Sequence, residues 1–187
     1  MTIDGFFADR VSVRTELPIS WQGLQAPLDE GQLAGLNEKN LALLRAVNAL
    51  EDHHGEGAEG GPVPAPEIQR LEAKLDLLLT LVGQLRMSSQ QLPASVSTQL
   101  AAAGVAWWPL DAVAAEVDDT GLLDISLGAY VAQPLSVPAR ILVHEIRDER
   151  DVVLAGFEGL SQQVAEALDK FVFRHHRRAI AGSRVTD

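Results

Sequence analysis

Asp124, Ser126 and His144 are the residue types that form a nucleophilic triad. In a triad, a histidine takes the proton of the serine hydroxyl and a carboxylate orients the histidine. Asp124 and Ser126 are two positions apart in a segment that reads as a strand, so both lie on the same side of it. The sequence around Ser126 does not suggest the strained turn that exposes a nucleophile. We therefore expect no catalytic residue and no enzyme.

Histidine pairs occur at His53 and His54 and at His175 and His176. Adjacent positions of a helix point in different directions, so neither pair is expected to hold a metal ion. The chain has no cysteine, which excludes thiolate ligands and disulfides. The segment GEGAEGG, residues 55–61, lacks the Lys and the hydroxyl residue of a phosphate-binding loop. We expect neither a metal nor a cofactor.

The charge of the chain is unevenly distributed. The net charge is −11, which argues against nucleic-acid binding, because that needs a basic face. Residues 170–187 nevertheless carry five basic residues against one acid, so the other 169 residues have a net charge of −15. Such a basic end can offset a helix dipole or contact an anion or partner. No apolar run approaches the roughly 18 residues of a membrane span, and we expect a cytoplasmic protein.

Segments with a period of two predict six strands, and therefore a small antiparallel barrel or sheet of the α+β class. The first strand contains Pro18, which cannot donate a backbone hydrogen bond, so we expect it at an edge. An amphipathic helix is expected from about Ser161. The predicted strands are residues 10–21, 95–99, 105–108, 122–128, 139–146 and 152–157.

Between the first two strands the period changes to that of heptad helices. Asp29 and Gln32 resemble a capping box, a Gly- and Pro-rich linker spans 55–65, and a second helix starts near Pro66. We predict an inserted helical hairpin over 29–92, and a barrel domain made of 1–28 plus 93–187. The first seam is Leu33, Leu36, Asn40, Leu43, Val47 and Leu50. The second is Ile68, Leu71, Leu75, Leu78, Val82, Leu85, Ser89 and Leu92.

The apolar stripe of these helices is wider than a seam between two helices. Leu79 and Leu81 flank the second seam, and Leu41 and Leu44 widen the first. A wide stripe needs several partner helices, which predicts a homo-oligomer, with a tetramer as the expected size. Asn40 would then fix the helix register. The alternative is an intramolecular hairpin in which the two seams bury each other.

Two long segments of the sequence resemble a known family. "ADRVSVRTELPISW" near the start and "VVLAGFEGLSQQVAEALDKFVFRHHRRAIA" near the end are similar to the opening and closing segments of PilZ domains. The heptad insert and "FRHHRR" resemble the atypical, tetrameric PilZ group. The resemblance implies a six-stranded barrel, a non-enzymatic role in cyclic di-GMP signalling, and an oligomer built by the inserted helices.

Typical members bind the dinucleotide with an Arg-x-x-x-Arg segment ahead of the first strand. Guanidinium groups suit this role because they bind phosphates bidentately and stack on guanine. In the register we prefer, the second Arg is Arg10 and Phe6 stands in the place of the first. Arg10 and Arg14 have the same spacing, but that register lies inside the strand.

The family's second element is an Asp-x-Ser-x-x-Gly turn, for which two segments compete. DISLG matches with Asp124 and Ser126, but it leaves too few strands after it to complete a barrel. QLAAAG matches only at Gly104, with Gln99 and Ala101 in place of the Asp and the Ser, yet it puts every later strand in order. We prefer QLAAAG, and DISLG then belongs to the fourth strand.

In this register, most of the side chains that bind the dinucleotide in typical members are missing. One arginine of two remains, and the polar pair of the turn is an amide and a methyl group. We therefore expect an oligomeric interaction module that acts on a protein partner and does not bind cyclic di-GMP strongly. The alternative is a true receptor that uses Arg10 with the basic cluster of Arg174, Arg177 and Arg178.

Overall fold

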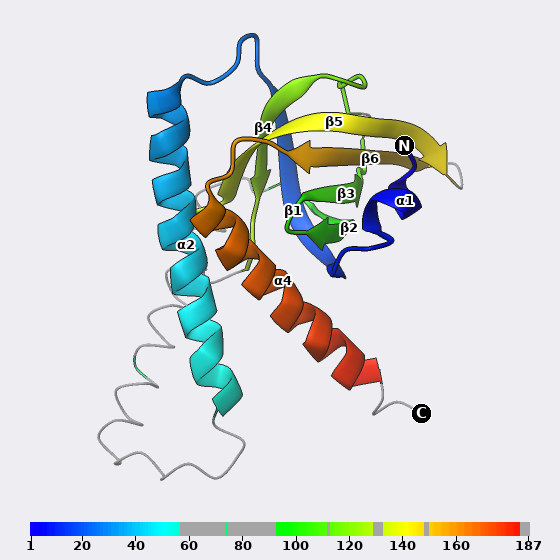
Figure 1. Ribbon diagram of the computed structural model, residues 1–187. Helices are drawn as coiled ribbons and strands as arrows, with labels where there is room; N and C mark the ends of the chain where they lie inside the picture. The colour runs from blue at the N-terminus through cyan, green and yellow to red at the C-terminus, as the bar shows by residue number, and fades with distance from the viewer. Residues whose placement is uncertain (57–73, 75–92, 112, 129–132, 148–149, 184–187) are drawn as a thin grey trace.

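The structure is a computed structural model that describes residues 1–56, 74, 93–111, 113–128, 133–147 and 150–183. Six strands stand beside a short N-terminal helix and two long helices (Figure 1). The helices are α1 (Ile3–Phe7), α2 (Glu30–Glu56) and α4 (Gln162–Ser183). The strands are β1 (Ser12–Gly23), β2 (Ser95–Ala101), β3 (Gly104–Trp108), β4 (Thr120–Ile125), β5 (Leu135–Arg147) and β6 (Arg150–Phe157).

The six strands are all antiparallel and form a closed barrel in the order β1-β2-β3-β6-β5-β4. The predicted α+β class and the six strands are confirmed. The edge position expected for β1 is wrong, because β1 is long enough to pair with two strands. Its residues up to Pro18 pair with β2, and those from Ile19 onward pair with β4. Pro18 is thus the last residue of β1 that pairs with β2. Its carbonyl accepts a hydrogen bond from Ser126 N.

The barrel is filled by side chains that alternate along its strands. In the first part of β5, Leu135, Val137, Ala139 and Ile141 all point into this core. A register shift between Ile141 and Val143 interrupts the pairing of β5 with β6. Beyond it, Val143 belongs to a second apolar cluster instead. After this register shift, the end of β5 therefore has an apolar side chain on the outside of the barrel.

Helix α1 covers that outer side. Its buried residues Ile3, Phe6 and Phe7 form the second cluster with side chains of β2, β3, β5 and β6. Thr2 caps the helix by accepting a hydrogen bond from Gly5 N at 3.2 Å. A five-residue helix has little stability of its own, so burial of its apolar side chains holds it in place.

Helices α2 and α4 pack against each other and against the barrel (Figure 1). The predicted capping box begins α2: Gln32 N donates to the Asp29 carboxylate at 2.8 Å, and Asp29 N donates to Gln32 Oε1 at 3.0 Å. Leu44 and Val47 of α2 are buried in the barrel core, together with Val164 and Leu168 of α4. This part of the expected insert therefore shares its core with the barrel.

Asn40 takes an intramolecular partner, in contrast to its expected place in a seam between chains. Its side chain donates to Ser136 O at 2.6 Å and accepts from Ser136 N at 3.2 Å. The side chain is buried because α2 lies on β5 at this point, with Leu36 and Leu43 half-buried nearby in sequence.

The second predicted seam, from Ile68 to Leu92, and the side chain of Leu50 lie outside the described residues. The heptad interaction of the two helices and the domain division at 29–92 therefore stay predictions. Within the described part of the chain, no helix is long and apolar enough to cross a membrane.

Candidate functional site

The segment QLAAAG forms the hairpin between β2 and β3. Ala101 pairs with Gly104 across the hairpin, and on the other side of β2 it pairs with Ser12 at the start of β1. The hairpin therefore lies beside the residues that enter β1, which is the arrangement that the preferred register requires. The structure therefore brings these residues together.

The ring of Phe6 packs on this hairpin at Gly104. A Cβ atom added to Gly104 would collide with the carbonyl oxygen of Ala155 and would lie 2.8 Å from Cζ of Phe6. Only a glycine allows this close approach of ring and backbone. Ala101 is fully buried in the same apolar cluster. The Phe6 ring therefore covers this side of the hairpin.

Arg10 and Gln99, the remaining polar residues of the expected site, already have partners. The Arg10 guanidinium lies 4.5 Å from the centroid of the Phe6 ring, and its Nη1 donates to Phe6 O. The Gln99 amide donates to Ser12 Oγ at 3.0 Å and accepts from Arg14 Nε at 3.3 Å. Arg14 therefore binds a neighbouring side chain on the outside of the barrel, as its place within the strand implies.

The basic end of α4 packs against other elements. Arg174 is half-buried and donates to Asn48 O of α2 at 2.9 Å. Arg177 lies over the ring of Phe173, 6.0 Å from its centroid. His176 Nδ1 lies 2.7 Å from Ser12 O, which places this part of α4 beside the start of β1. Arg178 is exposed on the same helix and also makes an interaction.

DISLG is a strand end rather than a turn. Asp124 and Ile125 close β4, where Asp124 pairs with Ser136 of β5 and its carboxylate accepts a hydrogen bond from the Ser136 hydroxyl. Ser126 is buried just after the strand, and Gly128 is exposed beyond it, so β4 ends earlier than predicted. These polar groups hold two strands together and form no separate site.

His144 is also explained by structural contacts. Its Nδ1 lies 2.9 Å from Ala115 O, and its Nε2 lies 3.7 Å from the Asp151 carboxylate. It therefore fastens the connection between β3 and β4 to β5, without contact to Asp124 or Ser126. Among the described residues, no group of three or more His, Asp or Glu side chains could hold a metal ion.

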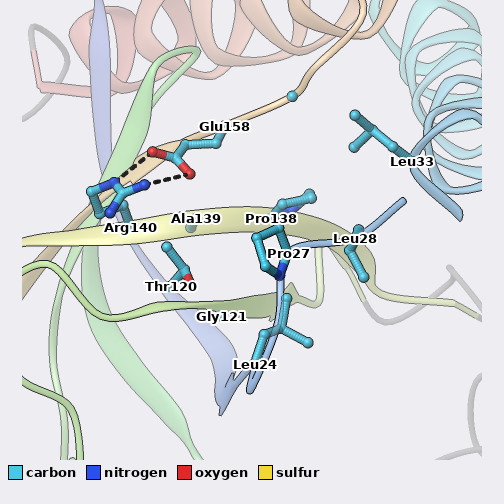
Figure 2. Close-up of a pocket in the computed structure, with 11 residues that line it drawn as sticks. Leu24, Pro27, Leu28, Leu33, Thr120, Gly121, Pro138, Ala139, Arg140 and Glu158 are labelled. Atoms are coloured by element: carbon cyan, nitrogen blue, oxygen red, sulfur yellow. Dashed lines mark hydrogen bonds and ion pairs between the residues drawn. The ribbon is translucent and has the colours of Figure 1, made fainter. Parts of the chain in front are cut away.

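A pocket of about 240 Å³ opens elsewhere on the barrel, at the start of α2 (Figure 2). Its walls come from the β1–α2 connection, the first turns of α2, strands β4 and β5, and the residues after β6. Most of the side chains are apolar. The lining residues are Leu24, Pro27, Leu28, Leu33, Thr120, Gly121, Pro138, Ala139, Arg140, Glu158 and Gly159.

An ion pair stands at one end of this pocket (Figure 2). Arg140 Nε lies 2.7 Å from Glu158 Oε1, and Nη1 of Arg140 donates to Asp118 O at 3.2 Å. The hydrogen bond and charge of Glu158, with a smaller contribution from the charge of Asp118, raise the pKa of Arg140 above its ordinary value. The guanidinium is therefore charged at every accessible pH.

Sequence reasoning did not find this pocket, because its residues come from segments far apart in the chain. Two local features of the structure hold the residues around it. Gly159 adopts a positive φ of 64°, and a Cβ there would lie 2.8 Å from Leu33 Cδ1. Asn37 donates to Gly159 O at 2.9 Å and accepts from Ser161 N at 2.8 Å, which ties α2 to the β6–α4 turn.

Comparison with known proteins gives a similar solved structure and a family. A search of curated proteins finds no match. A crystal structure of a pathogenic protein from Xanthomonas campestris is 26% identical, covers 94% of this chain and 93% of its own, and superposes with a TM-score of 0.74. It is described as a new tetrameric PilZ domain, self-assembled via an unusual helical bundle.

The family comparison agrees with that likeness. The family model described as "Atypical PilZ domain, cyclic di-GMP receptor" matches residues 42–185, which is well over half of the chain. The match includes the hairpin of β2 and β3, all strands after β1, and α4. The chain belongs to the atypical PilZ domain family.

Proposed function

We propose that this chain is a non-enzymatic, oligomeric interaction module in regulation linked to cyclic di-GMP, such as that of motility, adhesion or virulence. It acts on a protein partner in the cytoplasm and does not itself hold the dinucleotide strongly. Members of the PilZ class are regulatory modules rather than enzymes. The proposal differs from the family description only in the strength of ligand binding.

The observation that carries the proposal is the contact of Phe6 with Gly104. In this contact an apolar ring stands where the first family arginine would be, and it packs on the glycine of the expected turn. Loss of a hydrogen bond to a charged group costs on the order of 1.5–3 kcal/mol. Two or three such losses would weaken a micromolar ligand about a hundredfold or more.

Calorimetric titration with cyclic di-GMP tests this part. We expect no measurable heat for the natural chain at micromolar concentrations. A variant with Phe6→Arg and Gln99→Asp replaces two of the missing groups, and it should gain affinity if it melts cooperatively. Low-micromolar binding by the natural chain would overturn the proposal.

The oligomeric part rests on the wide apolar stripe of the predicted helices, and the similar Xanthomonas protein is described as a tetramer built by a helical bundle. We propose that the second helix carries the association, mainly through Ile68, Leu71, Leu75, Leu78, Val82, Leu85 and Leu92. Light scattering on a Leu75→Glu, Leu78→Glu variant should give a lower mass. An unchanged mass would favour the intramolecular hairpin.

A second candidate is a true receptor in which α4 replaces the missing groups. It is favoured by the His176–Ser12 contact, which brings the basic end of α4 beside the start of β1, close in sequence to Arg10. Arg174, Arg177 and Arg178 would supply the charge. If the natural chain binds cyclic di-GMP and the affinity falls in Arg10→Gln and Arg177→Gln variants, this candidate replaces the first.

A further inference from the structure

The pocket beside the start of α2 has the features of a preformed site for one large apolar side chain. Its volume of about 240 Å³ is smaller than the roughly 300–1,000 Å³ of most small-molecule sites. Leucine, proline and alanine side chains line it, together with the backbone of Gly121 (Figure 2). This lining can bury an apolar group but offers few polar atoms to orient a small molecule.

The pocket walls are fixed by hydrogen bonds before any partner arrives. Leu24 N donates to Thr120 O at 2.9 Å, and Glu158 N donates to Pro138 O at 2.8 Å. Asn37 holds the turn at Gly159 against α2 through the contacts described above. A site whose walls are already ordered loses less conformational entropy on binding.

The charges around the pocket are strongly unequal. Arg140 is the single cation among the lining residues, and its guanidinium is bonded to Glu158 and to Asp118 O. Exposed acids lie close in sequence to the lining residues. They are Asp29, Glu30, Asp118 and Asp119, in addition to Glu158 itself. The rim therefore attracts cations and repels an anionic surface such as an acidic membrane.

We propose that this pocket binds a protein partner through a segment in which one bulky apolar side chain, such as Phe or Leu, is flanked by Lys or Arg residues. The apolar side chain fills the pocket and the flanking cations meet the acidic rim. The inference deepens the interaction role proposed above and rests on it. Its test measures peptide binding, whereas the tests above measure nucleotide binding and mass, so the two can fail separately.

The probe is a capped pentapeptide with a central phenylalanine between pairs of lysine and arginine. Titration is followed by NMR through the backbone amides of Gly121 and Gly159, on the full chain. We expect saturable shifts at these amides. Replacing the central phenylalanine by alanine should weaken binding by about tenfold or more, because the buried apolar area is lost. Acidic flanks should weaken it further.

Two chain variants localise the effect. Leu28→Ser should abolish the shifts, whereas the matched control Leu110→Ser, at a leucine that is 71% exposed and outside this pocket, should leave them unchanged. A Glu30→Gln, Glu158→Gln double variant keeps the apolar walls and should reduce the affinity several-fold at low salt. Melting curves establish that each variant is folded.

Three results would overturn the inference. The first is binding that does not depend on the central side chain, which would mean a nonspecific charge effect. The second is binding that survives in folded Leu28→Ser. The third is a change of oligomer mass in Leu28→Ser without any peptide binding to the natural chain, which would assign the pocket to contacts between copies.

Discussion

Two places on the same barrel differ in what covers them. Beside the β2–β3 hairpin, the short helix α1 packs two phenylalanine rings onto the strands. Beside the start of α2, a pocket of similar apolar character stays open behind an ion pair. The first place is closed by apolar packing, whereas the second leaves room for a side chain.

The contact between α1 and the barrel is made mainly by packed apolar side chains. We therefore expect the largest effect on stability from Phe6→Ala. Phe6 is 6% exposed and touches the backbone at Gly104, so its removal leaves a cavity. We expect a loss of about 3–5 kcal/mol in the free energy of unfolding. Urea denaturation measures it. Phe173→Ala is the control, because Phe173 is 47% exposed and should cost little. If Phe6→Ala lowers the free energy of unfolding as little as Phe173→Ala does, α1 does not stabilise the barrel.

Glycines at the two places should also differ in their response to alanine. At Gly104 the added methyl meets the backbone of Ala155, which cannot move aside, and we expect a cost of about 1–3 kcal/mol. At Gly159 it meets only the end of the Leu33 side chain, so the cost should be the roughly 1–2 kcal/mol of the positive φ. Gly23→Ala is the control, since no atom lies within 4 Å. A cost at Gly159 above that at Gly104 would contradict the comparison.

Much of the barrel could be predicted from sequence, because its patterns are local. Alternation in each strand and the capping box at Asp29 are read from neighbouring residues. The two adjacent tryptophans of β3 also follow alternation: Trp107 is buried in the barrel core, and Trp108 packs on the cluster beneath α1. The heptad spacing of α2 is likewise a local pattern. The partner of its polar residue Asn40 is Ser136 of β5, which is far away in the sequence and could not be predicted.

The site could be predicted only in part. The position of QLAAAG followed from the order of the strands, which is a property of the whole chain. Helix α1 was missed, because five residues carry too little periodicity to indicate a helix. The open pocket was missed because five separate segments form it, and the turn at Gly159 with its hydrogen bond to Asn37 is visible only in the structure.

The place of α2 in the protomer gives the next prediction. Asn40→Ala would leave both backbone groups of Ser136 without their partner in a buried position. We expect a loss of about 1–3 kcal/mol in the free energy of unfolding, and no change in oligomer mass. Lys39→Ala, at the exposed neighbouring position, should change neither. A lower mass for Asn40→Ala with little loss of stability would place Asn40 in a seam between chains instead.

The smallest effect on stability is expected at the ion pair of the open pocket. Arg140 and Glu158 have side chains that are 39% and 45% exposed, so water screens their attraction and Glu158→Gln should not shift the melting temperature measurably. The ordinary pKa of an arginine already lies far above pH 9, and Glu158 only raises the pKa of Arg140 further. The guanidinium therefore stays charged in both proteins, and the melting temperatures should agree from about pH 6 to pH 9. The same substitution should still weaken the basic-flanked peptide at low salt, with the difference reduced at high salt. A clear loss of stability with unchanged peptide binding would mean that the Arg140–Glu158 ion pair stabilises the fold and does not attract a partner. The contrast between the covered hairpin and the open pocket would then lose its support.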